Sequence, residues 1–127
     1  KNMIKMEKKN KLSVKISKSK EDFDFFKKIY IRLMFKKKAE KNLFFKKNYF
    51  ENLFNLIAKY GFLVIVKYQE QNIAAGVFLH GEELLHYHLS AFDLNIKKNG
   101  TFNLMIYEAA MHGKELDWKH YIWEVEI

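Results

Sequence analysis

The hydrophobic period of the chain changes at Gly61, and this change does most to limit the fold. Before Gly61, apolar residues recur every three to four positions, as on one face of a helix. After it come three short apolar runs at 62–66, 73–79 and 84–92, separated by the polar segments 69–72 and 80–83. Short runs joined by tight turns predict three antiparallel strands in a meander. The sequence therefore predicts an α+β fold.

Further elements flank the meander. Residues 12–17 alternate between apolar and polar and predict a strand, and a short basic helix is expected over 1–11. Ser19, with Asp22 three residues on, predicts the start of a helix that fades in 36–38. A second helix is expected from Asn48 to a stop at Gly61.

The C-terminal part adds a helix over 102–116, capped by Thr101 or Asn103, and a strand over 121–127. A strand, a helix and another strand imply a crossover to a parallel neighbour. We therefore expect one domain over 1–127, with the order strand, two helices, three strands, helix and strand. Its sheet is mixed but mostly antiparallel, with helices on both faces.

Composition limits the chemistry and the setting. The chain has no cysteine, which excludes disulfides and thiolate zinc sites. No apolar run is long enough to span a bilayer, and the lysine-rich start lacks the apolar core of a signal peptide. We therefore expect a soluble, cytoplasmic protein.

The net charge of +8 is unevenly distributed. Residues 1–50 hold 17 Lys and Arg against 5 Asp and Glu, whereas residues 51–127 hold 6 against 10. A basic first part attracts partners that carry phosphate groups. The alternative explanation is a genome bias toward lysine codons, since Asn, Ile, Phe and Tyr are also common here.

Four segments resemble one family of transferases. NIAAGVFL at 72–79 is similar to the "x-IAAG-x-FL" strand of the FemABX-like aminoacyltransferases, and LHYHLSA at 85–91 resembles their "YHLS" strand. NLMIYEAA at 103–110 resembles their "N-x-LL-x-EA" helix, and KNMIKMEKKNKLSVKI at 1–16 is similar to their lead-in. The order of elements is that of the GNAT acyltransferase core. FemABX-like proteins have two GNAT-like halves, so we expect this chain to represent one, incomplete at its C-terminal end.

The resemblance implies a donor cleft where strands 84–92 and 121–127 part. Backbone groups exposed there would pair with an aminoacyl or pantetheine arm, and the N-terminus of the next helix would favour phosphate. The expected donor-binding residues are Ser90, Ala91, Phe92, Lys97, Lys98, Asn99, Gly100, Thr101 and Asn103. The alternative is an ordinary capped helix after a solvated basic loop.

Acyl transfer to an amine needs a base, a donor for the oxyanion and a proton for the leaving group. His86 and His88 lie two apart, so both face one side of their strand and either could act as base or donor. The alternative is that both are packed sheet histidines. A metal pair at that spacing lacks a third ligand, so no metal is expected.

Four other side chains are further candidates. Tyr107 or Tyr87 could protonate a leaving group, although tyrosines more often pack with a solvated hydroxyl. Glu108 is expected on the side of its helix opposite Met105 or near the edge of that side, as a buried anchor or an exposed residue. Glu124 shares one face of the last strand with 126, as a base or as an exposed edge.

Three functions remain open from the sequence. The first is FemABX-like aminoacyl transfer from an aminoacyl-tRNA to an amine, such as that of a peptidoglycan precursor. The second is acetyl-CoA-dependent N-acetylation, and the third is a non-catalytic GNAT-like interaction module. None requires a tightly bound cofactor. Because the last strand would leave an unpaired edge, a homodimer or a partner domain is expected to cover it.

Overall fold

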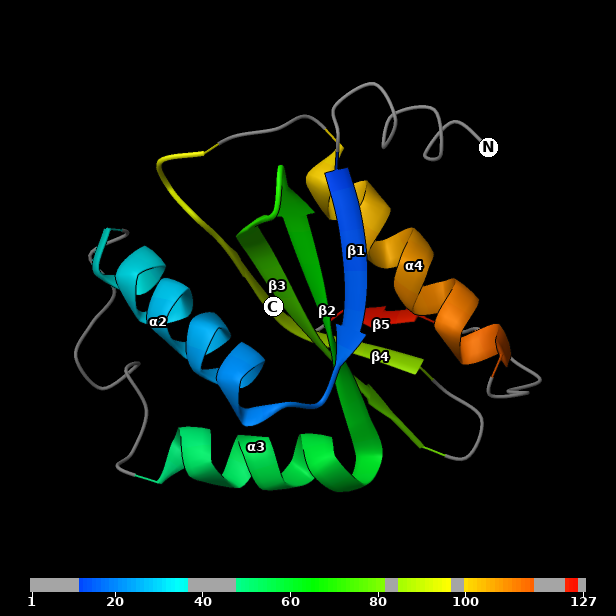
Figure 1. The fold of residues 1–127 in the computed structure, drawn as a ribbon. Coiled ribbons are helices and arrows are strands. Elements are labelled where there is room, and N and C mark those ends of the chain that lie inside the picture. Colours follow the sequence, from blue (N-terminus) through cyan, green and yellow to red (C-terminus); the bar gives the residue numbers. More distant parts are fainter. Residues whose placement is uncertain (1–11, 37–47, 82–84, 97–99, 116–122, 126–127) are drawn as a thin grey trace.

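The computed structural model describes residues 12–36, 48–81, 85–96, 100–115 and 123–125. Its strands are β1 (Leu12–Ser17), β2 (Gly61–Tyr68), β3 (Gln71–His80), β4 (Leu85–Phe92) and β5 (Trp123–Val125). Its helices are α2 (Lys20–Lys36), α3 (Tyr49–Tyr60) and α4 (Thr101–Glu115), arranged around the sheet as in Figure 1. No described helix has both the length and the apolar character needed to cross a membrane.

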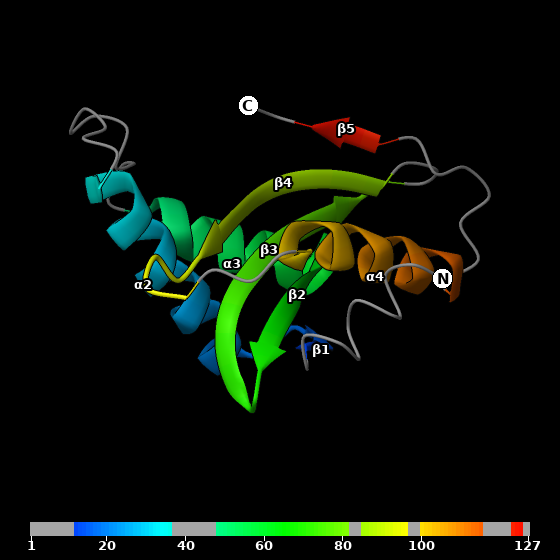
Figure 2. The same cartoon turned by 90° about the horizontal axis from the view of Figure 1, so that it is seen from above.

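The five strands form one sheet in the order β1-β2-β3-β4-β5. β1 to β4 pair antiparallel with one another, and β5 pairs parallel with β4. β5 lies at one edge of the sheet, beside β4 (Figure 2). The chain reaches β5 from β4 through α4, which is the crossover that the element order predicts. The expected α+β class and mixed, mostly antiparallel sheet are therefore confirmed.

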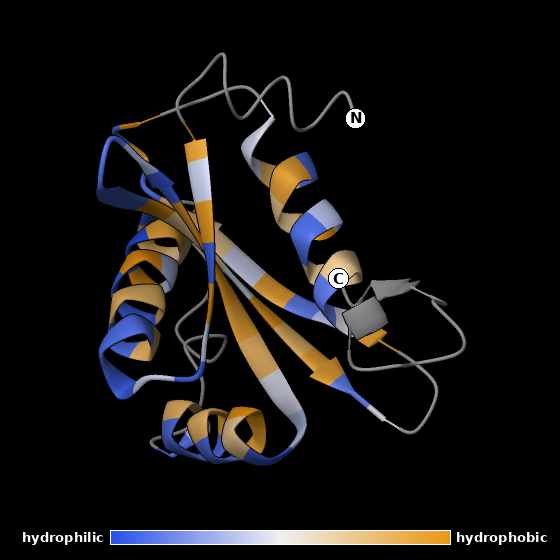
Figure 3. Ribbon diagram, turned by 45° about the vertical axis from the view of Figure 1, so that its right-hand side comes forward, coloured by the Kyte–Doolittle hydropathy of each residue, from blue (hydrophilic) through white to orange (hydrophobic). Residues whose placement is uncertain are grey.

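Helices cover both faces of the sheet, as predicted. One core cluster joins α2 and α3 to one face, through Leu63, Ile65, Val77 and Ala91 among others. The second cluster joins α4 to the opposite face, through Val64, Phe78 and Leu85. Figure 3 shows the hydrophobic residues concentrated on the central strands and on the helix sides next to them. Alternating side chains along each regular stretch of strand therefore face α2 and α3 on one side and α4 on the other.

The connection from β1 to α2 has a buried carboxylate at its centre. The backbone N–H of Asp22 donates to Ser19 Oγ at 3.1 Å, which is the predicted N-terminal cap. The carboxylate accepts hydrogen bonds from Ser17 Oγ at 2.6 Å and from Ser19 Oγ at 3.0 Å. It also forms an ion pair with Lys15 Nζ at 3.0 Å. Burial by itself would raise the pKa of Asp22, but these donors together hold it below its ordinary value.

Two glycines allow the backbone to approach its neighbours closely. A Cβ on Gly76 would lie 2.4 Å from Met105 Sδ, so the missing side chain lets α4 pack against the centre of the sheet. A Cβ on Gly61 would lie 2.4 Å from the carbonyl oxygen of Phe78. Gly61 therefore does more than end a helix, because it also begins β2 against the end of β3.

Several predicted boundaries move in the structure. The turn between β2 and β3 contains only Gln69 and Glu70, both with positive φ, and strand pairing resumes at Gln71. His80 belongs to β3, although it was expected in a turn. α4 begins at Thr101, so Gly100 occupies the cap position, and neither Thr101 nor Asn103 is the cap. The expected helix 1–11 lies outside the described residues.

Candidate functional site

The sheet is irregular in the middle of β4. Within the described ranges, β4 pairs with β5 through Leu85, His86 and Tyr87, which is as far as the described part of β5 reaches. The register with β3 shifts at the same place, where Tyr87 pairs with Phe78 and Leu89 with Val77. His88 is therefore the extra residue of a β-bulge, a feature that bends a strand and redirects its side chains.

The predicted histidine pair lies on the α2/α3 face at this bulge. The rings of His86 and His88 have centroids 6.0 Å apart, and both side chains are half-buried. Tyr49, the first residue of α3, places its hydroxyl 3.2 Å from Nε2 of His88. The predicted placement of both histidines on one side of the strand is confirmed. No sequence signal points to Tyr49, because 39 residues separate it from His88 and no local pattern joins them.

A second polar pair lies on the α4 face. The hydroxyls of Tyr87 and Ser90 are hydrogen-bonded to each other. The Tyr87 ring meets the ring of Phe102 edge-on, with centroids 5.6 Å apart. Ser90 pairs with Gly76, the residue against which Met105 packs. The second half of β4 therefore faces the first turn of α4.

The N-terminal turn of α4 lies beside these groups. Gly100 has a φ of 85°, a conformation that glycine adopts without strain, and the N–H of Leu104 donates to its carbonyl at 2.8 Å. Thr101 is buried, whereas Phe102 and Asn103 are exposed. The free backbone N–H groups of a helix N-terminus favour an anion. Lys97, Lys98 and Asn99 lie outside the described residues.

Two other predicted donor residues, Ala91 and Phe92, differ in how much of their side chains is exposed. Ala91 is fully buried in the core under α2 and α3, so its side chain cannot line a cleft and only its backbone is available. Phe92 is 39% exposed at the end of β4. Of the predicted donor set, Ser90, Phe92, Gly100 and Asn103 therefore belong to surfaces that a ligand can reach.

The sheet separates the predicted catalytic residues into two groups. Tyr107 and Glu108 belong to α4, whereas the histidines face α2 and α3. Glu108 is half-buried and follows the buried Met105 by three positions, so of the two positions expected for it the structure favours the one near an edge over the one opposite Met105. The side chains of β5, including Glu124, lie outside the described residues.

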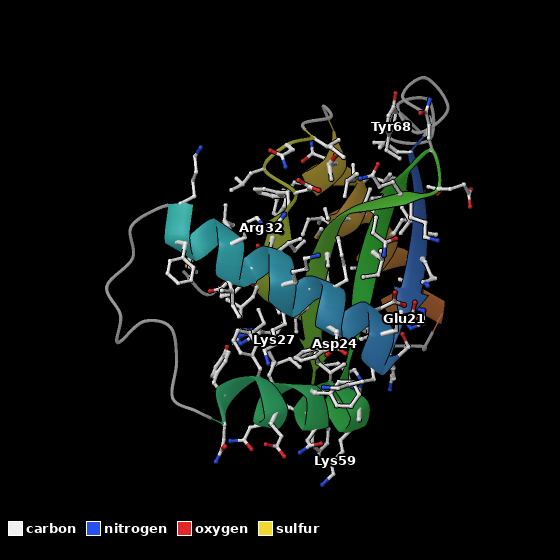
Figure 4. The ribbon with its side chains drawn as sticks, turned by 60° about the vertical axis from the view of Figure 1, so that its left-hand side comes forward. Glu21, Asp24, Lys27, Arg32, Lys59 and Tyr68 are labelled. Atoms are coloured by element: carbon white, nitrogen blue, oxygen red, sulfur yellow. The ribbon has the colours of Figure 1, made fainter. Side chains whose placement is uncertain are left out.

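Within the described ranges, no cluster of three or more His, Cys, Asp or Glu side chains is arranged to hold a metal ion. A groove of about 450 Å³ lies between α2 and the β2–β3 hairpin, lined in part by Lys28, Arg32, Lys67 and Asp93. No predicted site residue lines it. Figure 4 shows Arg32 on the exposed side of α2, in the same row as Glu21.

Comparison with known proteins gives matches at the level of structure. No protein-family model and no curated protein sequence matches the chain. An aminoglycoside acetyltransferase from an uncultured soil metagenomic sample matches with a TM-score of 0.65 and 16% identity, over 91% of this chain and 78% of that one. A predicted acetyltransferase from Clostridium acetobutylicum, solved with acetyl-CoA, has a TM-score of 0.68 and 14% identity, over 89% and 80%.

A ribosomal-protein-alanine N-acetyltransferase from Brucella melitensis biovar Abortus matches with a TM-score of 0.64 and 11% identity, over 91% of this chain and 80% of that one. These neighbours are GNAT-family acetyltransferases. At such identities the similarity establishes a common fold, so the chain has the GNAT acetyltransferase fold, as expected from its element order.

Proposed function

We propose that the chain catalyses N-acyl transfer from an acyl-CoA donor to an amine. The observation that carries the proposal is the coincidence of two features at one place. The bulge of β4 lies at His88, and the N-terminal turn of α4 lies beside it, where the ring of Phe102 meets the ring of Tyr87. The fold adds support, since one structural neighbour was solved with acetyl-CoA and others act as N-acetyltransferases.

In this proposal the donor lies along the second half of β4. Backbone groups of Ser90–Phe92 would pair with the amide groups of the pantetheine arm, as a further strand would. The phosphates would lie at the N-terminus of α4, near Gly100 and Asn103, with Lys97 and Lys98 as expected partners. His86 or His88 would act as the base, and Tyr87, Tyr107 or Glu108 would supply the proton that the thiolate needs.

Calorimetry with acetyl-CoA tests the donor site directly. Asn103→Glu places a negative charge beside the proposed phosphate site, and the position is exposed. At a helix N-terminus the new carboxylate does not destabilise the helix, so weaker binding could not be attributed to unfolding. We expect a loss of affinity of roughly fivefold or more, from a repulsion of about 1 kcal/mol.

The control for this variant is Asn55→Glu, the same change at an exposed position of α3 on the other face of the sheet. It should bind acetyl-CoA as the wild type does. No measurable binding by the wild type, or equal losses in the two variants, would contradict the proposed donor site. Thiol release in the presence of an aminoglycoside or of a peptide that begins with alanine then tests the transfer itself.

A second candidate is aminoacyl transfer from an aminoacyl-tRNA, as in the FemABX-like proteins. The four similar segments and the basic first part of the sequence favour it. The acceptor would then be the amine of a peptidoglycan precursor. Binding of an aminoacyl-tRNA at physiological salt, without binding of acetyl-CoA, would support this candidate. A chain that folds normally and binds neither donor would instead be a non-catalytic interaction module.

The edge of the sheet at β5 leads to a further proposal about assembly. β5 is the last strand in the sheet order of the described residues, and it pairs with β4 on one side. We expect a second copy or a partner domain to cover that edge. Sedimentation at high concentration tests this, and a monomer throughout would count against a homodimer.

A further inference from the structure

The Tyr49–His88 contact joins the first turn of α3 to the bulge of β4. The phenol Oη and the imidazole Nε2 are 3.2 Å apart, and both side chains are half-buried. The ring of Phe50 meets the Tyr49 ring edge-on, with centroids 5.2 Å apart and an interplanar angle of 82°. Phe50 in turn packs against the buried Tyr30 of α2, at 6.3 Å between centroids. These contacts hold the phenol in place from the side of the core.

The dyad of Tyr49 and His88 lies on the side of β4 away from the proposed donor. Tyr87 and Ser90 face α4, where the donor phosphates would lie, whereas His88 and Tyr49 belong to the α2/α3 face. β4 lies between the two faces, because Tyr87 and Ser90 project to one of them and His88 to the other. A thioester carbonyl held beside β4 at the bulge would therefore be open to an amine that approaches from the side of the dyad.

We propose that Tyr49 and His88 form the proton-accepting dyad for the acceptor amine, an inference that rests on the proposed acyl transfer. As the amine nitrogen bonds to the thioester carbonyl carbon, the proton that it loses passes to Oη of Tyr49, and the Tyr49 proton passes to Nε2 of His88. The C–S bond breaks, and the CoA thiolate takes a proton from the acid proposed above, Tyr87, Tyr107 or Glu108, which regains it from solvent. The imidazolium returns its proton to solvent, so the overall products are an amide and a thiol.

The chemistry of the dyad limits the protonation form in which the acceptor amine reacts. A phenol–imidazole pair carries no formal charge at neutral pH when the histidine is neutral, so it does not bind an ammonium group as a carboxylate would. The acceptor is therefore an amine that arrives in its neutral form or loses its first proton to water. The dyad removes the proton that becomes acidic once the nitrogen bonds to the carbonyl carbon.

The test uses Tyr49→Phe, with Tyr60→Phe as the matched control. Tyr60 lies at the other end of α3 and is 53% exposed, so the control removes the same hydroxyl from the same helix far along its length. Imidazole nitrogen and carbon NMR signals give the tautomer and the titration of each histidine. The chain has five histidines, and His88→Asn assigns the signal of His88 by its loss.

We expect Tyr49→Phe to change the tautomer balance and the titration midpoint of His88, while Tyr60→Phe leaves both unchanged. The rate of transfer should fall by about 10²-fold or more in Tyr49→Phe, with its pH profile displaced, because general-base catalysis typically contributes that much. The affinity for acetyl-CoA should stay at the wild-type value, since neither residue faces the donor.

An unchanged His88 spectrum in a folded Tyr49→Phe variant would overturn the dyad, whatever the donor experiments show. An unchanged transfer rate would overturn its catalytic role. Absence of acetyl-CoA binding by the wild type would instead contradict the proposed function, so the two failures are distinguishable.

Discussion

Replacement of Asp22 by alanine tests how firmly α2 is attached to β1. Asp22 is 5% exposed, and its carboxylate accepts hydrogen bonds from Ser17 and Ser19 and forms an ion pair with Lys15. A hydrogen bond to a charged group contributes about 1.5–3 kcal/mol, whereas the cap bond from the backbone N–H of residue 22 to Ser19 remains in the variant. Both serines reach solvent, and Lys15 is 47% exposed, so alanine leaves no donor buried without water. We therefore expect Asp22→Ala to lower the free energy of unfolding by about 2–3 kcal/mol.

Asp24→Ala is the control on the same helix. Asp24 lies on the exposed side of α2, where Figure 4 labels it, and pairs with Lys20 at 3.3 Å with both side chains more than half exposed. Exposed pairs contribute about 0–1 kcal/mol. Urea unfolding of the three proteins at pH 7 gives both differences. A loss in Asp22→Ala no larger than that in Asp24→Ala would refute the assignment of a structural role to the buried carboxylate.

The pH dependence of this difference gives a second check. The pKa of Asp22 is lowered in the folded state, so the unfolded chain binds the proton first as the pH falls. The contribution of Asp22 is therefore present above the ordinary pKa of an aspartate, about 3.9, and is lost as the pH falls through the lower folded value. The difference between wild type and Asp22→Ala should shrink below about pH 4. A difference that stays constant from pH 7 to pH 3 would mean that the charge of Asp22 contributes nothing.

Three other substitutions have defined outcomes. Gly61→Ala should lower the free energy of unfolding by about 2–3 kcal/mol in urea, because its Cβ would lie 2.4 Å from the Phe78 carbonyl oxygen. Glu70→Gly should raise it by about 1 kcal/mol, since Glu70 has a φ of 69° that glycine adopts without strain; a loss of stability would contradict this. Burial and the nearby charge of Lys18 lower the pKa of His80 in the folded state, so the unfolded chain binds the proton first as the pH falls. The free energy of unfolding of the wild type should therefore fall between pH 7 and 5 more steeply than that of His80→Gln.

Elements that depend on local periodicity could be predicted well. The alternation in 12–17 predicts β1 with the bounds that the structure has, and Ser19 with Asp22 predicts the cap that forms. The meander also follows, because short apolar runs and tight turns are local signals. The two-residue turn was predicted too long, since Gln69 and Glu70 adopt positive φ without the glycine or asparagine that normally marks such a turn.

The candidate site was only partly predictable. The spacing of His86 and His88 places both on one side of their strand, and the structure agrees. No spacing could indicate that His88 occupies a bulge, because a bulge arises from the register between two strands. The packing of Ala91 against α2 and α3 also depends on which face each helix covers.

The order of helices and strands follows from the sequence, because each element has its own hydrophobic period, and that order resembles the GNAT core. The tertiary structure alone brings Tyr49 to His88 and sets Tyr87 and Ser90 against the start of α4. Those contacts join residues from separate elements, and they depend on strand register, on the bulge and on the faces that the helices cover. The two faces of β4, on which the proposed chemistry depends, are therefore a product of packing rather than of any local pattern.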